Sequence, residues 1–85
     1  MQLHIIYTET DIFLTKHPYA SWRNIQDMYP DYKASLGPWE QGEVIGFLAD
    51  EYSNISPSAE EQVLGFLSSS KDTKSVTFSG ASIAV

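Results

Sequence analysis

Apolar residues alternate with polar ones at the two ends of the chain and recur with helical spacing between them. Residues 2–7 carry apolar side chains at every second position (Leu3, Ile5 and Tyr7), which predicts a β-strand. After a polar break, residues 12–15 predict a second strand that closes a hairpin. The chain is therefore expected to begin with a strand or a hairpin.

A helix is expected after the polar and proline-containing segment that follows. Ser21 is suited to the N-cap position, and Trp22, Ile25 and Met28 are spaced along one helical face. Pro30 ends this helix, because proline lacks a backbone donor and clashes with the preceding turn.

Residues 30–52 predict a helical turn and then a longer helix. The turn passes through Tyr32 and Leu36 and ends at Gly37, a residue suited to the C′ position. Pro38 is placed to begin the next helix, where its missing N–H costs nothing. The apolar spacing continues to about Tyr52.

A short internal repeat marks two of the expected helices. The sequence VIGFL at 44–48 returns as VLGFL at 63–67, an offset of 19 residues, and each copy follows a proline. Ser56 and Pro57 are expected to begin the second helix, and Ser58 with Glu61 offers an alternative start as a capping box. This helix is expected to run to about residue 67.

Both copies of the repeat place a glycine in mid-helix, Gly46 in the first and Gly65 in the second. Glycine costs roughly 1 kcal/mol relative to alanine in a helix interior. Because both helices accept this cost at the same position, we expect them to cross or dock closely there.

The end of the chain has a strand pattern. Val76 and Phe78 alternate with polar residues, and after Gly80 the apolar phase flips through residues 81–85, as a β-bulge would produce. Strands at both ends with helices between them predict an α+β fold. We expect one domain over residues 1–85, with a small antiparallel sheet packed on one face by about three helices.

Composition limits the class of protein. The chain has 85 residues, of which 42% are hydrophobic and 13% aromatic, as in ordinary globular domains. The absence of cysteine excludes a disulfide framework and agrees with a reducing compartment. Neither a signal peptide nor a membrane-spanning run is visible, so a cytoplasmic protein is expected.

Negative charge is concentrated in the middle of the chain. The formal net charge is −6, and between Ala34 and Ser70 there are six acidic residues and no lysine or arginine. The remaining residues balance, with five acids and five bases. Such a field repels nucleic acid and favours a protein partner with a basic surface, or it serves only as a solvated face that keeps the protein soluble.

Acidic and aromatic residues interleave over the two repeated helices, as in surfaces that recognise other proteins. The alternative is that Phe47 and Phe66 widen the apolar stripes that face the core, while Trp39 stands opposite the first stripe. By helical spacing these stripes are Val44, Ile45, Leu48 and Tyr52 in the first helix and Val63, Leu64 and Leu67 in the second. The candidate partner-binding residues are Trp39, Glu40, Glu43, Phe47, Asp50, Glu51, Glu60 and Glu61.

Candidate catalytic groups are few. His4 and His17 are the only histidines, and neither has further metal-ligating residues at a usable spacing. Glu9 and Asp11 fit the turn of the expected hairpin, where carboxylates are commonly solvated. The sequence therefore predicts neither a metal site nor a cofactor, and it does not favour an enzyme.

Three functions remain open. The favoured one is a small acidic inhibitor or adaptor that docks on a basic protein surface, as small acidic phage and mobile-element inhibitors of bacterial defence do. The second is an oligomeric accessory protein, such as a homodimer, that assembles through its helices or its C-terminal strand. The third is a small enzyme or ligand binder that uses His4, His17 and Glu9.

Overall fold

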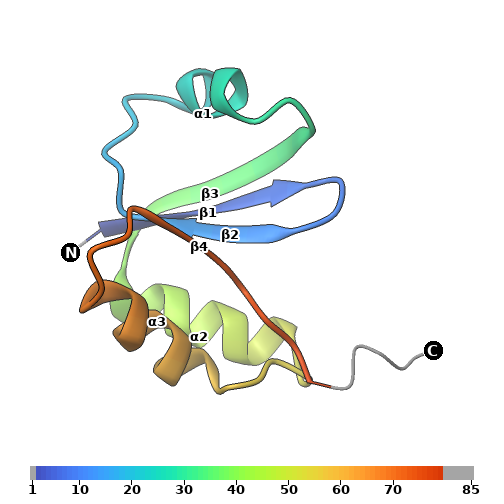
Figure 1. The fold of residues 1–85 in the computed structure, drawn as a ribbon, viewed down its shortest axis with the longest axis vertical. Coiled ribbons are helices and arrows are strands. Elements are labelled where there is room, and N and C mark those ends of the chain that lie inside the picture. Colours follow the sequence, from blue (N-terminus) through green and yellow to red (C-terminus); the bar gives the residue numbers. More distant parts are fainter. Residues whose placement is uncertain (1, 80–85) are drawn as a thin grey trace.

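The computed structural model describes residues 2–79 and gives them an antiparallel sheet of four strands with three helices. The strand order is β3-β1-β2-β4 (Figure 1). The strands are β1 (Gln2–Thr8), β2 (Ile12–Thr15), β3 (Tyr32–Glu40) and β4 (Thr73–Ser75), and the helices are α1 (Trp22–Met28), α2 (Gln41–Glu51) and α3 (Ala59–Leu67). The expected α+β fold and the N-terminal hairpin are confirmed.

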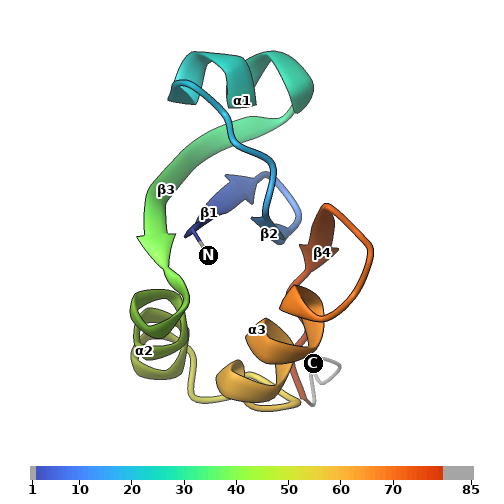
Figure 2. The same ribbon diagram turned by 90° about the vertical axis from the view of Figure 1, so that its left-hand side faces the viewer.

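The expectation that all helices cover one face of the sheet is wrong. Figure 2 shows α2 and α3 on one side of the sheet and α1 on the other. The reason lies in β1, whose residues from Leu3 to Ile6 are all buried, so that neither of its faces can be left to water. Ile25 of α1 is 1% exposed and lies on the same side as Ile6.

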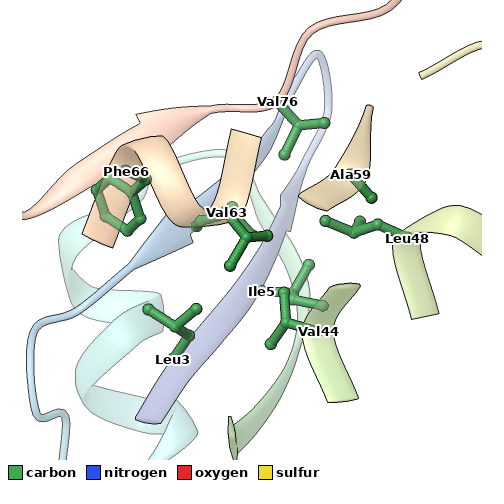
Figure 3. Close-up of a cluster of buried hydrophobic side chains, with 9 residues drawn as sticks. Leu3, Ile5, Val44, Leu48, Ala59, Val63, Phe66 and Val76 are labelled. Carbon is green, nitrogen blue, oxygen red and sulfur yellow. The ribbon is translucent and has the colours of Figure 1, made fainter. Parts of the chain in front are cut away.

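The larger core lies between the sheet and the α2–α3 pair. Leu3 and Ile5 of β1 point toward these helices, and Val44 and Val63 meet them from α2 and α3 (Figure 3). The buried cluster consists of Leu3, Ile5, Leu14, Val44, Leu48, Ala59, Val63, Phe66 and Val76.

The helical turn expected through Tyr32, Leu36 and Gly37 is instead the edge strand β3. Gly37 has φ +114° and lies so close to β1 that a Cβ atom would be 2.6 Å from the carbonyl oxygen of Leu3. The pairing shifts here, since Leu3 faces Trp39 while Ile5 faces Leu36. The glycine therefore serves a bulge in a strand and does not end a helix.

Helix α2 begins later than expected. Pro38 follows a cis peptide bond and belongs to β3, so it does not open the helix. Glu40 is the N-cap residue, and its backbone N–H donates to the Glu43 carboxylate at 3.2 Å within a capping box. Carboxylates at this end also suit the positive end of the helix dipole.

Helix α3 begins at the alternative start. Ser58 is its N-cap residue, Glu61 completes a capping box with it, and Pro57 lies before the helix. The buried face includes Phe66, whereas Leu64, expected in the apolar stripe, is 41% exposed. The buried face of α3 is thus rotated toward Phe66 and away from Leu64, compared with the stripe expected from the sequence.

The repeat does not mark a helix crossing. A Cβ atom added to Gly46 or Gly65 would meet nothing within 4 Å, and both residues are exposed. The expectation of a close contact at these glycines is wrong, because the repeat copies the positions that face the sheet, Val44 and Val63, and leaves the glycines on the outer side.

The last strand lies slightly earlier than expected. β4 pairs with β2 through Thr73, Lys74 and Ser75, and the Val76 N–H then donates to the Ile12 carbonyl at 2.8 Å. Phe78 forms an isolated bridge with Ile55, in the loop between the two repeated helices. The bulge expected at Gly80 and the strand after it lie outside the described residues.

Helix α1 begins after Ser21, as expected, although the Ser21 side chain makes no capping hydrogen bond. Its apolar residues do not form a buried stripe, because Trp22 is 53% and Met28 is 64% exposed. The helix is held by Ile25 and by Tyr29, whose ring lies 5.6 Å from that of Phe13.

Candidate functional site

The sequence-predicted recognition surface divides into structural and unpaired carboxylates. Glu43 and Glu61 close the capping boxes of α2 and α3, so their carboxylates stabilise the helix starts. Glu40 is exposed and serves as the N-cap residue of α2. These three acids have a clear role in folding.

The two aromatic members of that surface pack against each other. The rings of Trp39 and Phe47 lie 5.4 Å apart in an edge-on arrangement, and both side chains are half-buried against the core. Trp39 belongs to the last part of β3, so the helical position opposite the apolar stripe, expected from the sequence, is wrong. The two rings therefore lie at the edge of the core and remain partly exposed to solvent.

Three carboxylates have no such structural role. Asp50 and Glu51 lie exposed in the last turn of α2, and Glu60 lies exposed in the first turn of α3. None of the three forms an ion pair with a lysine or arginine within residues 2–79. They remain available to a group outside this part of the chain.

Two of the basic side chains have partners elsewhere in the fold. The ammonium of Lys16 donates to the carbonyls of Phe66 at 3.1 Å and Ser69 at 2.8 Å, at the C-terminal end of α3. It also lies 4.6 Å from the centre of the Phe66 ring. Arg23 stacks on Trp22, so its charge stays on the α1 side of the sheet.

The turn between β1 and β2 borders a hollow of about 310 Å³. Glu9 and Asp11 line it together with Tyr7, Val76 and Phe78. The Thr10 hydroxyl donates to Asp11 at 2.8 Å, and both carboxylates are exposed. This agrees with the expectation that Glu9 and Asp11 lie in the hairpin turn and are exposed to solvent.

Burial raises the pKa of Tyr7 strongly, and its neighbours Tyr52 and Glu51 raise it further. The Tyr52 hydroxyl lies 3.4 Å from that of Tyr7, which joins α2 to β1. A phenol held neutral in this way serves packing and hydrogen bonding rather than proton transfer near pH 7.

The two histidines, far apart in the sequence, meet around one ring. Tyr19 lies 6.0 Å from His4 and 4.5 Å from His17, measured between ring centres. All three line a hollow of about 350 Å³ with Gln2, Lys16, Pro18 and Pro38. Glu9, which the sequence analysis grouped with His4 and His17 as a candidate ligand-binding residue, does not line this hollow.

Sequence reasoning treated His4 and His17 separately because no pattern links a strand residue to a residue of the following connection. The available signal is Pro18 with Tyr19 beside His17, which predicts a turn there. Within the described part of the chain, no three His, Cys, Asp or Glu side chains are grouped to hold a metal ion. Among those residues, no helix is long and apolar enough to cross a membrane.

Comparisons with protein-family models, with curated proteins and with solved structures returned no match. The function is therefore argued from charge, burial and geometry alone.

Proposed function

We propose that this protein is a small interaction protein, an inhibitor or adaptor, that docks the acidic side of its α2–α3 layer on a basic protein surface. The surface centres on Asp50, Glu51 and Glu60, with the half-buried rings of Trp39 and Phe47 beside the same helices.

The observation that carries the proposal is the pair Asp50 and Glu51 in the last turn of α2. A helix C-terminus carries partial negative charge, so acidic residues there are unfavourable and basic ones favourable. The last turn of α2 holds no basic residue, and neither acid has an ion-pair partner within residues 2–79. Their presence does not help the helix, and a basic partner would explain it.

The concentration of acids along the α2 and α3 segment supports the same kind of partner. All six acids between Ala34 and Ser70 belong to α2, to α3 or to the N-cap of α2, and this segment has no lysine or arginine. Such a field speeds encounter with a basic surface and fixes orientation. A nucleic-acid-binding protein in the cytoplasm has such a surface, which is the target expected for an inhibitor of a bacterial defence system.

The test uses two variants with equal change in net charge. Asp50→Lys with Glu51→Lys reverses the proposed surface, while Glu9→Lys with Asp27→Lys reverses two exposed acids elsewhere. The wild type is expressed with an affinity tag in bacteria, and the basic protein that it captures is identified and purified. Association rates with that protein are then measured at low and high salt.

The Asp50/Glu51 variant should associate about tenfold more slowly at low salt, and the difference should shrink as salt screens the charges. The Glu9/Asp27 variant should lose much less. Equal association rates for the two variants would mean that only net charge matters, and the proposed role of Asp50 and Glu51 would be wrong. Circular dichroism should show both variants folded.

A further inference from the structure

A second surface, on the α1 side of the sheet, has a different chemistry. The hollow of about 350 Å³ beside Tyr19 is in the size range of small-molecule sites. No carboxylate lines it, although the chain carries 11 acidic residues. Its polar side chains can all donate a hydrogen bond, and they are Gln2, His4, Lys16, His17 and Tyr19.

His4 is the unusual member of this lining. Its side chain is 7% exposed, yet within residues 2–79 it makes no hydrogen bond and only an edge-on ring contact with Tyr19. No fully buried side-chain nitrogen or oxygen among these residues lacks a partner, so the His4 ring nitrogens retain access to solvent. The hollow that His4 lines is the direction from which a hydrogen-bonding group can reach it.

We propose that this hollow binds a small molecule through an anionic oxygen, a carboxylate or a phosphate, with His4 and His17 as the donors. An acceptor placed in the hollow would give the largely buried His4 imidazole a hydrogen-bond partner that the described part of the chain does not provide. The site shares no lining residue with the proposed acidic α2–α3 surface.

An adjoining hollow suggests what the rest of the ligand is like. A space of about 390 Å³ shares His17, Pro18 and Tyr19 with the first and continues to Ala20 and Met28. Met28 is 64% exposed. A ligand with its anionic group at His4 can therefore lay a non-polar part along Tyr19 toward Met28, with Asn24 and Asp27 at the far end.

Charges of both signs lie around the histidine end. Lys16 lines the hollow, although its ammonium is held by the Phe66 and Ser69 carbonyls. The acids near this end are Asp27, which lines the adjoining hollow, and Asp72, whose charge contributes to the raised pKa of Tyr19. Burial lowers the pKa of His4, so the bound anion should act in the opposite direction and favour the charged imidazole.

The experiment follows the imidazole signals of the full chain by NMR, which the presence of only two histidines makes simple to assign. Acetate, inorganic phosphate and phenyl phosphate are titrated separately at constant ionic strength, with sodium chloride as the reference. We expect saturable shifts of both imidazoles and a rise in the pKa of His4. Tighter binding of phenyl phosphate than of inorganic phosphate would show that the site also accepts a non-polar group. A preference for acetate would identify carboxylates as the ligand class.

Variants separate a site from general screening. His4→Phe keeps a ring against Tyr19 and removes the nitrogens, and it should weaken binding by about tenfold or more. Gln2→Ala, at an exposed position, should weaken it less, whereas Lys71→Gln, in a separate hollow, should leave it unchanged. Shifts equal to those with chloride, or an unchanged affinity in both His4→Phe and Gln2→Ala, would overturn the proposal.

Discussion

The side-chain amide of Gln62 pairs with the main chain of Thr77 in both directions. Its Nε2 donates to the Thr77 carbonyl at 3.0 Å, and the Thr77 N–H donates to its Oε1 at 3.0 Å. Nε2 also donates to the Pro57 carbonyl at 2.7 Å. With 2% of its surface exposed, Gln62 replaces a neighbouring strand for the backbone that follows β4.

Removing this amide should destabilise the fold by more than its size suggests. In Gln62→Leu the Thr77 N–H and the Pro57 carbonyl lose their partner, and a buried unsatisfied group costs about 1–3 kcal/mol. Urea unfolding should therefore show a loss in this range. Leu64→Ala, at an exposed position of the same helix, should change stability by less than about 0.5 kcal/mol. A loss in Gln62→Leu no larger than that would show that the pairing contributes little.

Glycine positions should respond in opposite directions. Gly46→Ala and Gly65→Ala should each raise stability by about 0.5–1 kcal/mol, because nothing lies within 4 Å of the added Cβ atom and alanine favours the helix. Gly37→Ala should be destabilising, since its φ is +114° and the Cβ atom would meet the Leu3 carbonyl. Thermal melting of the three variants measures this, and a lower melting temperature for Gly46→Ala would contradict the open space around it.

Lys16 should stabilise α3 through the end of that helix. Its ammonium donates to two carbonyls there, those of Phe66 and Ser69, and a cation is favourable at a helix C-terminus. Lys16→Met keeps most of the aliphatic stem and should cost about 1 kcal/mol in denaturant unfolding. Lys71→Met removes the same charge from an exposed position and should cost much less. Equal effects would mean that net charge alone matters.

Stability should decrease in mildly acidic solution because of His4. Its pKa is lowered from 6.5 in the folded protein by burial, so below about pH 6.5 the unfolded chain binds the proton more readily. The free energy of unfolding is therefore unaffected by His4 above that pH. It decreases as the pH falls from about 6.5 toward the lowered pKa of His4. Unfolding free energies measured between pH 8 and pH 5, values chosen to span about 6.5, should fall more steeply for the wild type than for His4→Phe. Parallel curves would exclude His4 as the source.

The elements that the sequence predicted well are those set by local patterns. The β1–β2 hairpin follows from alternation and a polar turn. The start of α3 follows from the Ser58–Glu61 capping box, the alternative to the start at Ser56 and Pro57 that was expected first. The residues facing the sheet in the repeat, Val44 and Val63, were also assigned correctly by periodicity.

The errors arise where long-range pairing decided the local structure. Residues 32–40 contain Gly37 and Pro38, which are typical of a turn or a helix boundary, but pairing with β1 makes the segment a strand, and Gly37 then serves a bulge. Likewise His4 and Ile6 look like the outer face of a strand, but both are buried in the fold, and the Tyr19 ring lies against His4. The contacts of Tyr19 with His4 and His17 depend on how the segment after β2 packs against β1, so no local sequence pattern predicts them.

The sheet order has a consequence for the nascent chain on the ribosome. β3, β1 and β2 and the helix α1 all lie within the first 40 residues, so this half can pair its strands early in synthesis. The apolar face formed by Leu3, Ile5 and Leu14 then stays uncovered until α2 and α3 have emerged, and β2 gains β4 only near the end. A chain stopped before Thr73 would leave β2, a strand of the apolar core, at the edge of the sheet in place of the short β4, and an edge of this kind favours aggregation.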